Sequence, residues 1–182
     1  MPRDTPLLSP STGGRRSYAK VAHLVALGLG SGALSCGSTG AVSITVDVQN
    51  PVMTVSAPSA LASQLSGSFS LHLELGKVAP SGADVTIGQG NFNLVDPAHQ
   101  STLVLLKFTT APAAPYHLEP GGKLDIAFTI ADSAGAPGQL VTKDEATSIC
   151  AARAAVQIAG SFTDGANGST PVNSASFAVG CP

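Results

Sequence analysis

The sequence contains no tryptophan, few aromatic residues and few charges. Of its 182 residues, 4% are aromatic and 11% are charged, whereas glycine occurs 20 times and proline 13 times. Glycine and proline interrupt helices, so this composition disfavours a coiled coil or helical bundle and is typical of short strands joined by turns. Apolar residues make up 43% of the chain, which is too many for a chain that stays disordered throughout.

Basic residues are scarce after position 36. That part of the chain has ten acidic residues and only five basic ones, so its formal net charge is −5. The five basic residues are Lys77, Lys107, Lys123, Lys143 and Arg153. Binding to nucleic acid requires clustered lysine and arginine side chains, so we expect no nucleic-acid partner.

The chain also lacks an apolar run long enough to span a bilayer. The longest run, Val21–Leu34, is shorter than the roughly 20 residues that cross a hydrocarbon core, and three glycines interrupt it. It follows the basic residues Arg15, Arg16 and Lys20, and it ends in small residues. This order predicts a cleaved export signal rather than a buried helix.

Residues 15–20 read Arg-Arg-Ser-Tyr-Ala-Lys and are similar to the twin-arginine export motif. Arg15 and Arg16 match the two arginines, Tyr18 takes the aromatic position and Lys20 takes the lysine position. Gly14 and Ala19 depart from the motif. The general secretory route therefore stays open as the alternative.

Residues 33–36, Ala-Leu-Ser-Cys, resemble the lipobox of bacterial lipoproteins, although the first two depart from the usual residues. The resemblance implies a diacylglyceryl thioether on Cys36, usually with a third acyl chain on the new amino terminus. Two or three chains hold a protein firmly at a membrane, whereas one holds it only marginally. Gly37 replaces the Asp that often retains such proteins at the inner membrane, which indicates the outer membrane. Ordinary cleavage after Ala33 is the competing interpretation.

The chain has only three cysteines, Cys36, Cys150 and Cys181. An even pair in an exported domain is normally oxidised, so we expect a disulfide between Cys150 and Cys181, which leaves Cys36 for the lipid. These two cysteines bracket a predicted hairpin whose arms meet around residues 164–168. Folding about a centre near 165–166 places them opposite each other.

Short runs of alternating apolar and polar residues recur after position 40, which is the pattern of half-buried strands. In the cleanest run, residues 66–75, Phe69, Leu71 and Leu73 alternate with polar residues. The expected strands are residues 41–48, 51–56, 66–75, 85–87, 91–95, 102–109, 123–130, 154–162 and 172–179. We expect the dense run 102–109 near the centre of a sheet, and only residues 59–65 and 143–149 are compatible with a helical turn.

Eight or nine such strands predict an all-β domain over residues 41–182, an antiparallel β-sandwich of the immunoglobulin-like kind, with a barrel as the alternative. Leu118-Glu119-Pro120-Gly121 and the strand after it resemble a turn of bacterial immunoglobulin-like domains. Residues 1–35 are expected to be an extension with the cleaved signal. Residues 36–40 are expected to be the lipidated cysteine and a short tether.

Residues with catalytic or metal-binding chemistry are sparse in this domain. We expect His72 on the polar face of a strand, and His99 and His117 in loops. Because the three histidines are far apart in the sequence, we expect them to be solvated rather than to form a zinc site. The loop 164–169 carries several oxygen side chains that could hold calcium, but a plain hairpin turn is the favoured interpretation. We predict no catalytic residue, no metal and no cofactor.

Together these patterns predict a non-enzymatic lipoprotein of the cell envelope with a structural, adhesion or scaffolding role. It would be held at the membrane by lipid on Cys36 and would contact an unidentified envelope or surface protein. A small-ligand or calcium-binding lipoprotein is the alternative. A hydrolase is a third hypothesis, which would require a pocket where Ser, His and Asp side chains converge.

Overall fold

The computed structural model describes residues 43–59, 62–165 and 168–182. The chain divides into Met1–Gly37 and a compact unit, Ser38–Pro182. The predicted lipid site Cys36 and the predicted signal residues Arg15, Arg16 and Lys20 lie outside the described residues. The described residues of the compact unit form β-strands and one helix, α1.

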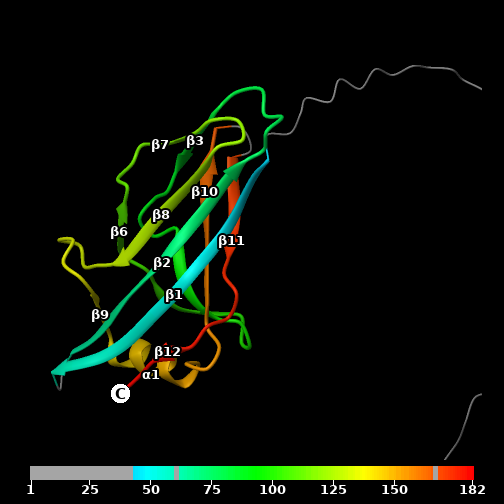
Figure 1. Ribbon diagram of the computed structural model, residues 1–182. Coiled ribbons are helices and arrows are strands. Elements are labelled where there is room, and N and C mark those ends of the chain that lie inside the picture. The colour runs from blue at the N-terminus through cyan, green and yellow to red at the C-terminus, as the bar shows by residue number, and fades with distance from the viewer. Residues whose placement is uncertain (1–42, 60–61, 166–167) are drawn as a thin grey trace, which may run out of the picture. The chain divides into compact units, whose positions relative to one another are not determined.

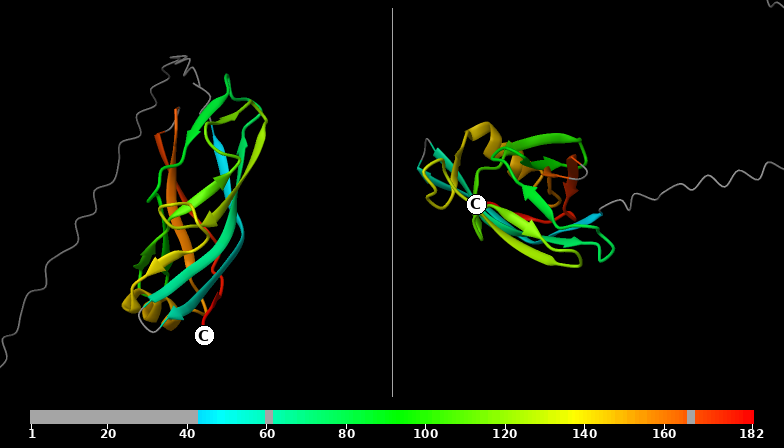
Figure 2. Two further views of the ribbon diagram at one scale, coloured as in Figure 1. Left: turned by 90° about the vertical axis from the view of Figure 1, so that its left-hand side faces the viewer. Right: turned by 90° about the horizontal axis from the view of Figure 1, so that it is seen from above.

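Two sheets pack face to face (Figures 1 and 2). Sheet A has the order β12-β1-β2-β8-β6, with β9 also beside β2, and sheet B has the order β5-β4-β10-β3-β7, with β11 also beside β10. The strands of sheet A are β1 (Ile44–Ser59), β2 (Ala62–Leu75), β6 (Phe108–Ala111), β8 (Lys123–Ile130), β9 (Gln139–Val141) and β12 (Val179–Gly180). Those of sheet B are β3 (Ala83–Thr86), β4 (Phe92–Asp96), β5 (Ser101–Leu105), β7 (Tyr116–Leu118), β10 (Gln157–Asp164) and β11 (Gly168–Asn173). All strand pairs are antiparallel except β1 with β12, which is parallel.

The predicted β-sandwich is confirmed, but the described residues form 12 strands rather than eight or nine. Most of the difference comes from strands of two to four residues, such as β6, β7, β9 and β12. Alternation cannot be recognised over so few positions. Tertiary hydrogen bonding, rather than local sequence pattern, defines these strands.

The two strands predicted at residues 41–48 and 51–56 form one bent strand, β1, in the described residues. Gln49 pairs with Ser70 but Val52 pairs with Ser68, so one extra residue of β1 is accommodated as a bulge, and Asn50 has a φ of 50°. The bulge reverses which alternate residues face the core. Val48 is therefore buried before it and Met53 after it, whereas Val52 is 62% exposed.

The prediction that residues 102–109 form one central strand is wrong. The run divides into β5, at an edge of sheet B, and β6, at an edge of sheet A. Its dense apolar character has another cause: Val104, Leu106 and Phe108 are buried as the chain passes from one sheet to the other.

Two glutamine side chains complete the hydrogen bonds of this crossing segment. Gln139, only 3% exposed, accepts from the Lys107 N–H at 2.7 Å and donates to the Leu105 carbonyl at 3.0 Å. Gln89 donates to the Phe108 carbonyl at 2.6 Å and accepts from its N–H at 3.4 Å. The side-chain amides thus take the place of a neighbouring strand.

Aromatic rings from both sheets form the centre of the core. Phe69 of β2 stacks on Phe128 of β8 with ring centroids 4.5 Å apart, and Phe92 of β4 meets Phe128 edge-on at 5.5 Å. Phe108 joins the group from β6 at 4.9 Å from Phe128. Each of these four phenylalanines is at most 5% exposed.

Helix α1 (Lys143–Ala151) agrees with the predicted helical turn at 143–149. It begins with a capping box, in which the Glu145 N–H donates to the Thr142 hydroxyl and the Thr142 N–H donates to the Glu145 carboxylate. The other stretch compatible with a helical turn, 59–65, is not helical in its described residues. It joins the end of β1 to β2, where Ser59 pairs with Ala62.

The predicted disulfide between Cys150 and Cys181 is confirmed. The predicted hairpin is formed by β10 and β11, where Asp164 pairs with Gly168. Beyond this hairpin an isolated bridge joins Val156 to Phe177, shifted by one residue from the register of β10 and β11. Cys150 itself lies in α1, not in a strand. The disulfide therefore joins the last turn of α1 to the segment that follows β12.

We predict that replacing Gln139 with Leu lowers the free energy of unfolding by about 1 to 3 kcal/mol, because it leaves the backbone groups of the crossing segment without their partner. Urea titration measures the change. Gln157→Leu is the matched control, since Gln157 makes only an exposed bond to Ser176, and a surface substitution is expected to change stability by less than about 0.5 kcal/mol. Equal effects would contradict this role for Gln139.

We also predict that the double variant Cys150→Ser/Cys181→Ser unfolds more easily, by about 2 to 5 kcal/mol, because the bridge closes a loop with a sequence separation of 31. Urea titration of oxidised and variant protein measures the difference. Cys36→Ser is the control and leaves the unfolding of the domain unchanged. Two free thiols at Cys150 and Cys181 in non-reduced protein would exclude the bridge.

Candidate functional site

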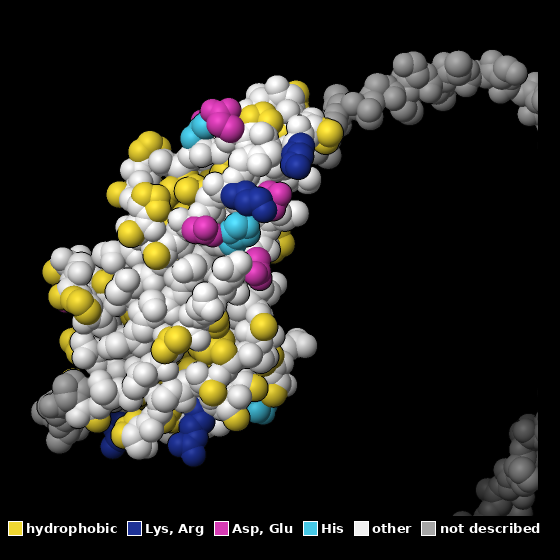
Figure 3. Space-filling model, in the orientation of Figure 1, with side chains coloured by type: hydrophobic (Ala, Val, Ile, Leu, Met, Phe, Trp, Pro, Cys, Tyr) yellow, Lys and Arg dark blue, Asp and Glu magenta, His cyan; other side chains and the backbone are white. Residues whose placement is uncertain are grey.

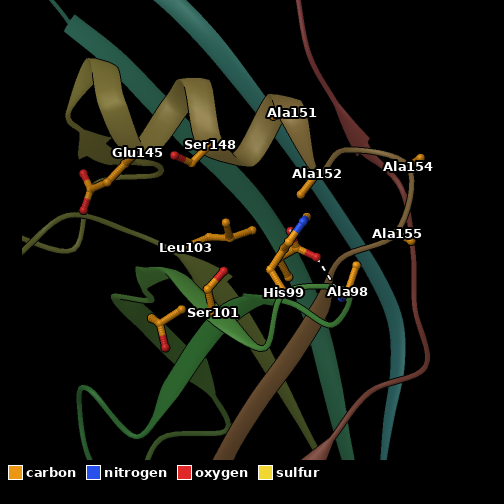
Figure 4. Close-up of a pocket in the computed structure, with 12 residues that line it drawn as sticks. Ala98, His99, Ser101, Leu103, Glu145, Ser148, Ala151, Ala152, Ala154 and Ala155 are labelled. Carbon is orange, nitrogen blue, oxygen red and sulfur yellow. Dashed lines mark hydrogen bonds and ion pairs between the residues drawn. The ribbon is translucent and has the colours of Figure 1, made fainter. Parts of the chain in front are cut away.

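An open groove of about 540 Å³ lies between β5 and α1 (Figure 4). Ser101, Thr102 and Leu103 of β5 form one wall. Glu145, Ser148 and Ala151 form the other, because residues three apart lie on the same face of a helix. Ala152, Ala154 and Ala155 line one end of the groove, where their small side chains leave space.

An Asp–His pair lies in the turn that leads from β4 into β5. The Nδ1 atom of His99 is 2.6 Å from one carboxylate oxygen of Asp96, and the Ala98 N–H donates to the other oxygen at 2.9 Å. These hydrogen bonds, first that from His99, hold the pKa of Asp96 below its ordinary value of 3.8, although burial acts in the opposite direction. The His99 side chain is 79% exposed, whereas that of Asp96 is 11% exposed.

The pair defines the orientation of the imidazole. Because Asp96 is ionised, its oxygen accepts, and Nδ1 of His99 must carry the proton. The opposite ring nitrogen, Nε2, is then left for other contacts at the groove. The prediction that His99 lies in a loop is confirmed, but its partner Asp96 was not recognised in the sequence, where the two are only three residues apart.

Two serines, Ser101 and Ser148, line the same groove. In a hydrolase, a serine hydroxyl would be hydrogen-bonded to the free nitrogen of the histidine. Among the described residues no hydrogen bond joins His99 to either serine. The groove therefore contains an oriented histidine without an activated nucleophile.

A second group of polar residues lies on the outer face of sheet A (Figure 3). His72 of β2 contacts Asp125 of β8 at 2.5 Å, and in the register of β1 and β2 it also stands opposite Asp47. The Lys123 ammonium contacts the Glu74 carboxylate at 2.9 Å and lowers its pKa. The prediction that His72 lies on the polar face of a strand is confirmed, and exposed pairs of this kind stabilise a sheet only weakly.

The prediction that His117 lies in a loop is wrong, because His117 belongs to β7. Its Nδ1 atom is 2.7 Å from Asp84 of β3, and its Nε2 atom is 3.4 Å from Glu119. The hydrogen bond with Asp84 is the main reason that the pKa of His117 lies above 6.5. The ring also passes over Gly82, where a Cβ atom would collide with it.

No group of three or more His, Cys, Asp or Glu side chains in the described part of the chain could hold a metal ion. In the loop predicted as a possible calcium site, the Asp164 carboxylate accepts from the Thr170 hydroxyl at 3.3 Å, and residues 166–167 lie outside the description. Asp164 as a whole is 5% exposed, so it is buried against the rest of the domain. Calcium binding by this loop therefore stays the untested alternative to a plain hairpin turn.

Comparison of the chain with protein-family models, curated protein sequences and solved structures gave no match. Within residues 43–59, 62–165 and 168–182, no helix is both long and apolar enough to cross a membrane.

We predict that Asp84→Asn lowers the pKa of His117 toward its ordinary value, as measured by NMR titration of the imidazole. Because the folded-state pKa is raised, the pair stabilises the fold most below about pH 6.5 while both carboxylates are charged. This stabilisation is lost as the pH rises through the folded-state pKa of His117.

Asp47→Asn is the matched control, because it removes the same charge from an exposed strand position that does not contact His117. Thermal unfolding from pH 5.5 to pH 8.5 should show the Asp84→Asn deficit shrinking as the pH rises. A loss of stability in Asp84→Asn that grows as the pH rises would contradict a raised pKa of His117.

Proposed function

We propose that the chain is a cell-envelope lipoprotein, held at the membrane by lipid on Cys36, with a non-enzymatic structural, adhesion or scaffolding role. The observation that carries this proposal is the pairing of the cysteines. Cys150 and Cys181 are bonded to each other. Cys36 is thus left over, at the end of a signal-like segment and in the position where a lipoprotein carries its acyl chains.

The start of the domain supports a close attachment. β1 begins at Ile44, eight residues after Cys36. Eight extended residues span at most about 28 Å. A domain anchored in this way would stay near the bilayer surface, and we propose the outer membrane because Gly37 replaces the inner-membrane retention signal.

The direction of β1 determines which end of the domain would face a partner. From Ile44 to Val55, β1 advances by about 36 Å at the usual rise per residue. Val55 and Ala57 lie beside Ala146 and Thr147 of α1, around one small hollow. Helix α1 is therefore at the end of β1 remote from Ile44 (Figure 1), and the groove beside the helix would point away from the membrane.

The groove supports a binding role more than a catalytic one. It is open, its walls come from an edge strand and a helix, and the one oriented histidine has no serine hydroxyl in hydrogen-bond contact. Binding surfaces of this shape occur at sheet edges in recognition modules. This is the support for a scaffolding or adhesion role.

The anchor is tested by replacing Cys36 with Ser. We predict that the variant moves from the membrane fraction to the soluble fraction and loses labelling by an alkyne analogue of palmitate. Ser35→Ala is the matched control, because it keeps a small residue before the cysteine, and it should remain membrane-bound and labelled. A Cys36→Ser protein that stays in the membrane fraction would show that the lipid assignment is wrong.

A further inference from the structure

We propose that the loop between β2 and β3, residues 76–82, rests on the surface of the lipid bilayer, with the Val78 side chain among the lipid headgroups and the Lys77 ammonium at a lipid phosphate. This inference rests on the proposed membrane attachment and deepens it, because it names the face of the domain that touches the membrane. The occupant of this face is lipid, and the experiments distinguish it from a protein partner.

The loop lies where the chain enters the domain. The Gly76 N–H donates to the Ser43 carbonyl at 3.1 Å, and Leu75 pairs with Ile44, the first residue of β1. Figures 1 and 2 show the loop beyond the first residues of β1, at the end of the sandwich opposite α1. Ser43 follows Cys36 by seven residues. A fully extended tether therefore leaves this end of the domain at most about 25 Å from the lipid site.

The turn at the tip of the loop has an unusual centre. The Ala79 N–H donates to the Gly76 carbonyl at 3.1 Å, so Lys77 and Val78 are the two central residues. Four other described turns are closed by the same kind of bond, and their central pairs are Gln89-Gly90, Pro120-Gly121, Ser133-Ala134 and Arg153-Ala154. None of these pairs contains a large aliphatic residue. A valine in this place is unusual, because turns favour Gly, Pro, Asn, Asp and Ser.

Val78 is the most exposed large aliphatic side chain in the described residues. It is 88% exposed, compared with 71% for Leu140. Pro80, two residues further on, is also exposed, so the loop presents apolar surface to its surroundings. A single exposed valine needs no explanation on most surfaces. Here it stands on the face that a short tether would hold near lipid, where apolar surface can leave water by entering the headgroup region.

Lys77 adds a positive charge beside the exposed valine. From Gly76 to Ala83 the chain has this one basic residue and no acidic residue. The Lys77 stem passes Gly121, where a Cβ atom would be 3.1 Å from the Lys77 Cγ atom. No ion pair involves Lys77 in the described part of the chain. The ammonium is therefore available to the phosphates of anionic lipids, which attract lysines at a membrane surface.

Two carboxylates close to this end of the domain already have a partner. Asp84 and Glu119 both contact His117 of β7, at 2.7 Å and 3.4 Å. The imidazole, when protonated, offsets part of their charge and so weakens their repulsion of lipid phosphates. The charge of Lys77 is not offset by an ion pair of this kind.

The contact is tested with tryptophan, because the sequence contains none and an introduced tryptophan is observed without background. The probe is Val78→Trp in the full chain, purified in its membrane-attached form and reconstituted into vesicles of phosphatidylethanolamine and phosphatidylglycerol. We expect brominated acyl chains in the vesicles to lower its emission at least about twofold. The reason is that a side chain at the interface reaches about 5 to 10 Å into the boundary between headgroups and acyl chains.

Leu140→Trp is the matched control. Leu140 is also an exposed aliphatic residue, and it pairs with Gln64 of β2, eleven residues before Leu75. At the usual rise per residue this distance is about 36 Å, so brominated chains should lower its emission by less than about a tenth. Equal quenching of the two variants would overturn the proposal. Blue-shifted emission of Val78→Trp without quenching would also overturn it, since a protein and not lipid would then cover the loop.

Tryptophan itself prefers the membrane interface, so the native valine is tested through its effect on Lys77. In vesicles we expect a water-soluble acylating reagent to modify Lys77 at least about twofold faster in Val78→Ser than in the wild type, because the loop loses its apolar contact with lipid. Val52→Ser is the matched control and should leave this rate unchanged. Lys143, at the start of α1, is the internal reference. An equal rate in Val78→Ser and the wild type would contradict the contact.

The outcomes separate this contact from the anchor. If Cys36→Ser remained membrane-bound while the emission of Val78→Trp was quenched, the lipid assignment would fail and the loop contact would stand. If Cys36→Ser became soluble but Val78→Trp and Leu140→Trp were quenched equally, the anchor would stand and the loop contact would fail. A protein that did not associate with the vesicles at all would contradict both.

Discussion

The fold depends on one passage of the chain between its two sheets. Residues 105–108 leave an edge of sheet B and enter an edge of sheet A, and in doing so their backbone groups lose regular strand partners. Gln139 and Gln89 supply those partners from the side, while Leu106 bonds to the Phe92 carbonyl and Lys107 to Ala131. With its polar groups satisfied, the segment can bury Leu106 and Phe108 in the interface, where the aromatic cluster joins both sheets.

Much of this architecture could be predicted from the sequence, and the failures have a common cause. Residues 66–75 and 123–130 show clean alternation because one face of each strand is buried and the other is solvated. The bulge at Asn50 and the crossing at 105–108 could not be predicted in the same way. Their geometry depends on partners that are 19 or 34 residues away in the sequence, and a local pattern does not contain that information.

The candidate site shows the same limit. The capping box that starts α1 can be recognised in Thr142 and Glu145, and the Asp96–His99 turn is a local feature. What could not be predicted is that these two short motifs face each other across a groove. The cysteines are the exception, because their even number after position 36 and their places on either side of the hairpin were enough to predict the bridge, although Cys150 lies in α1.

The course of β1 has a mechanical consequence. Its hydrogen bonds to β2 extend along nearly its whole length, from Ile44 to Ser59, and it also runs parallel to β12. Tension applied at the first residues and resisted at the α1 end acts along these strands, so many hydrogen bonds are sheared together instead of being opened one after another. A domain stretched between its amino-terminal end and a partner in the groove would therefore transmit force through its most extensively paired strand.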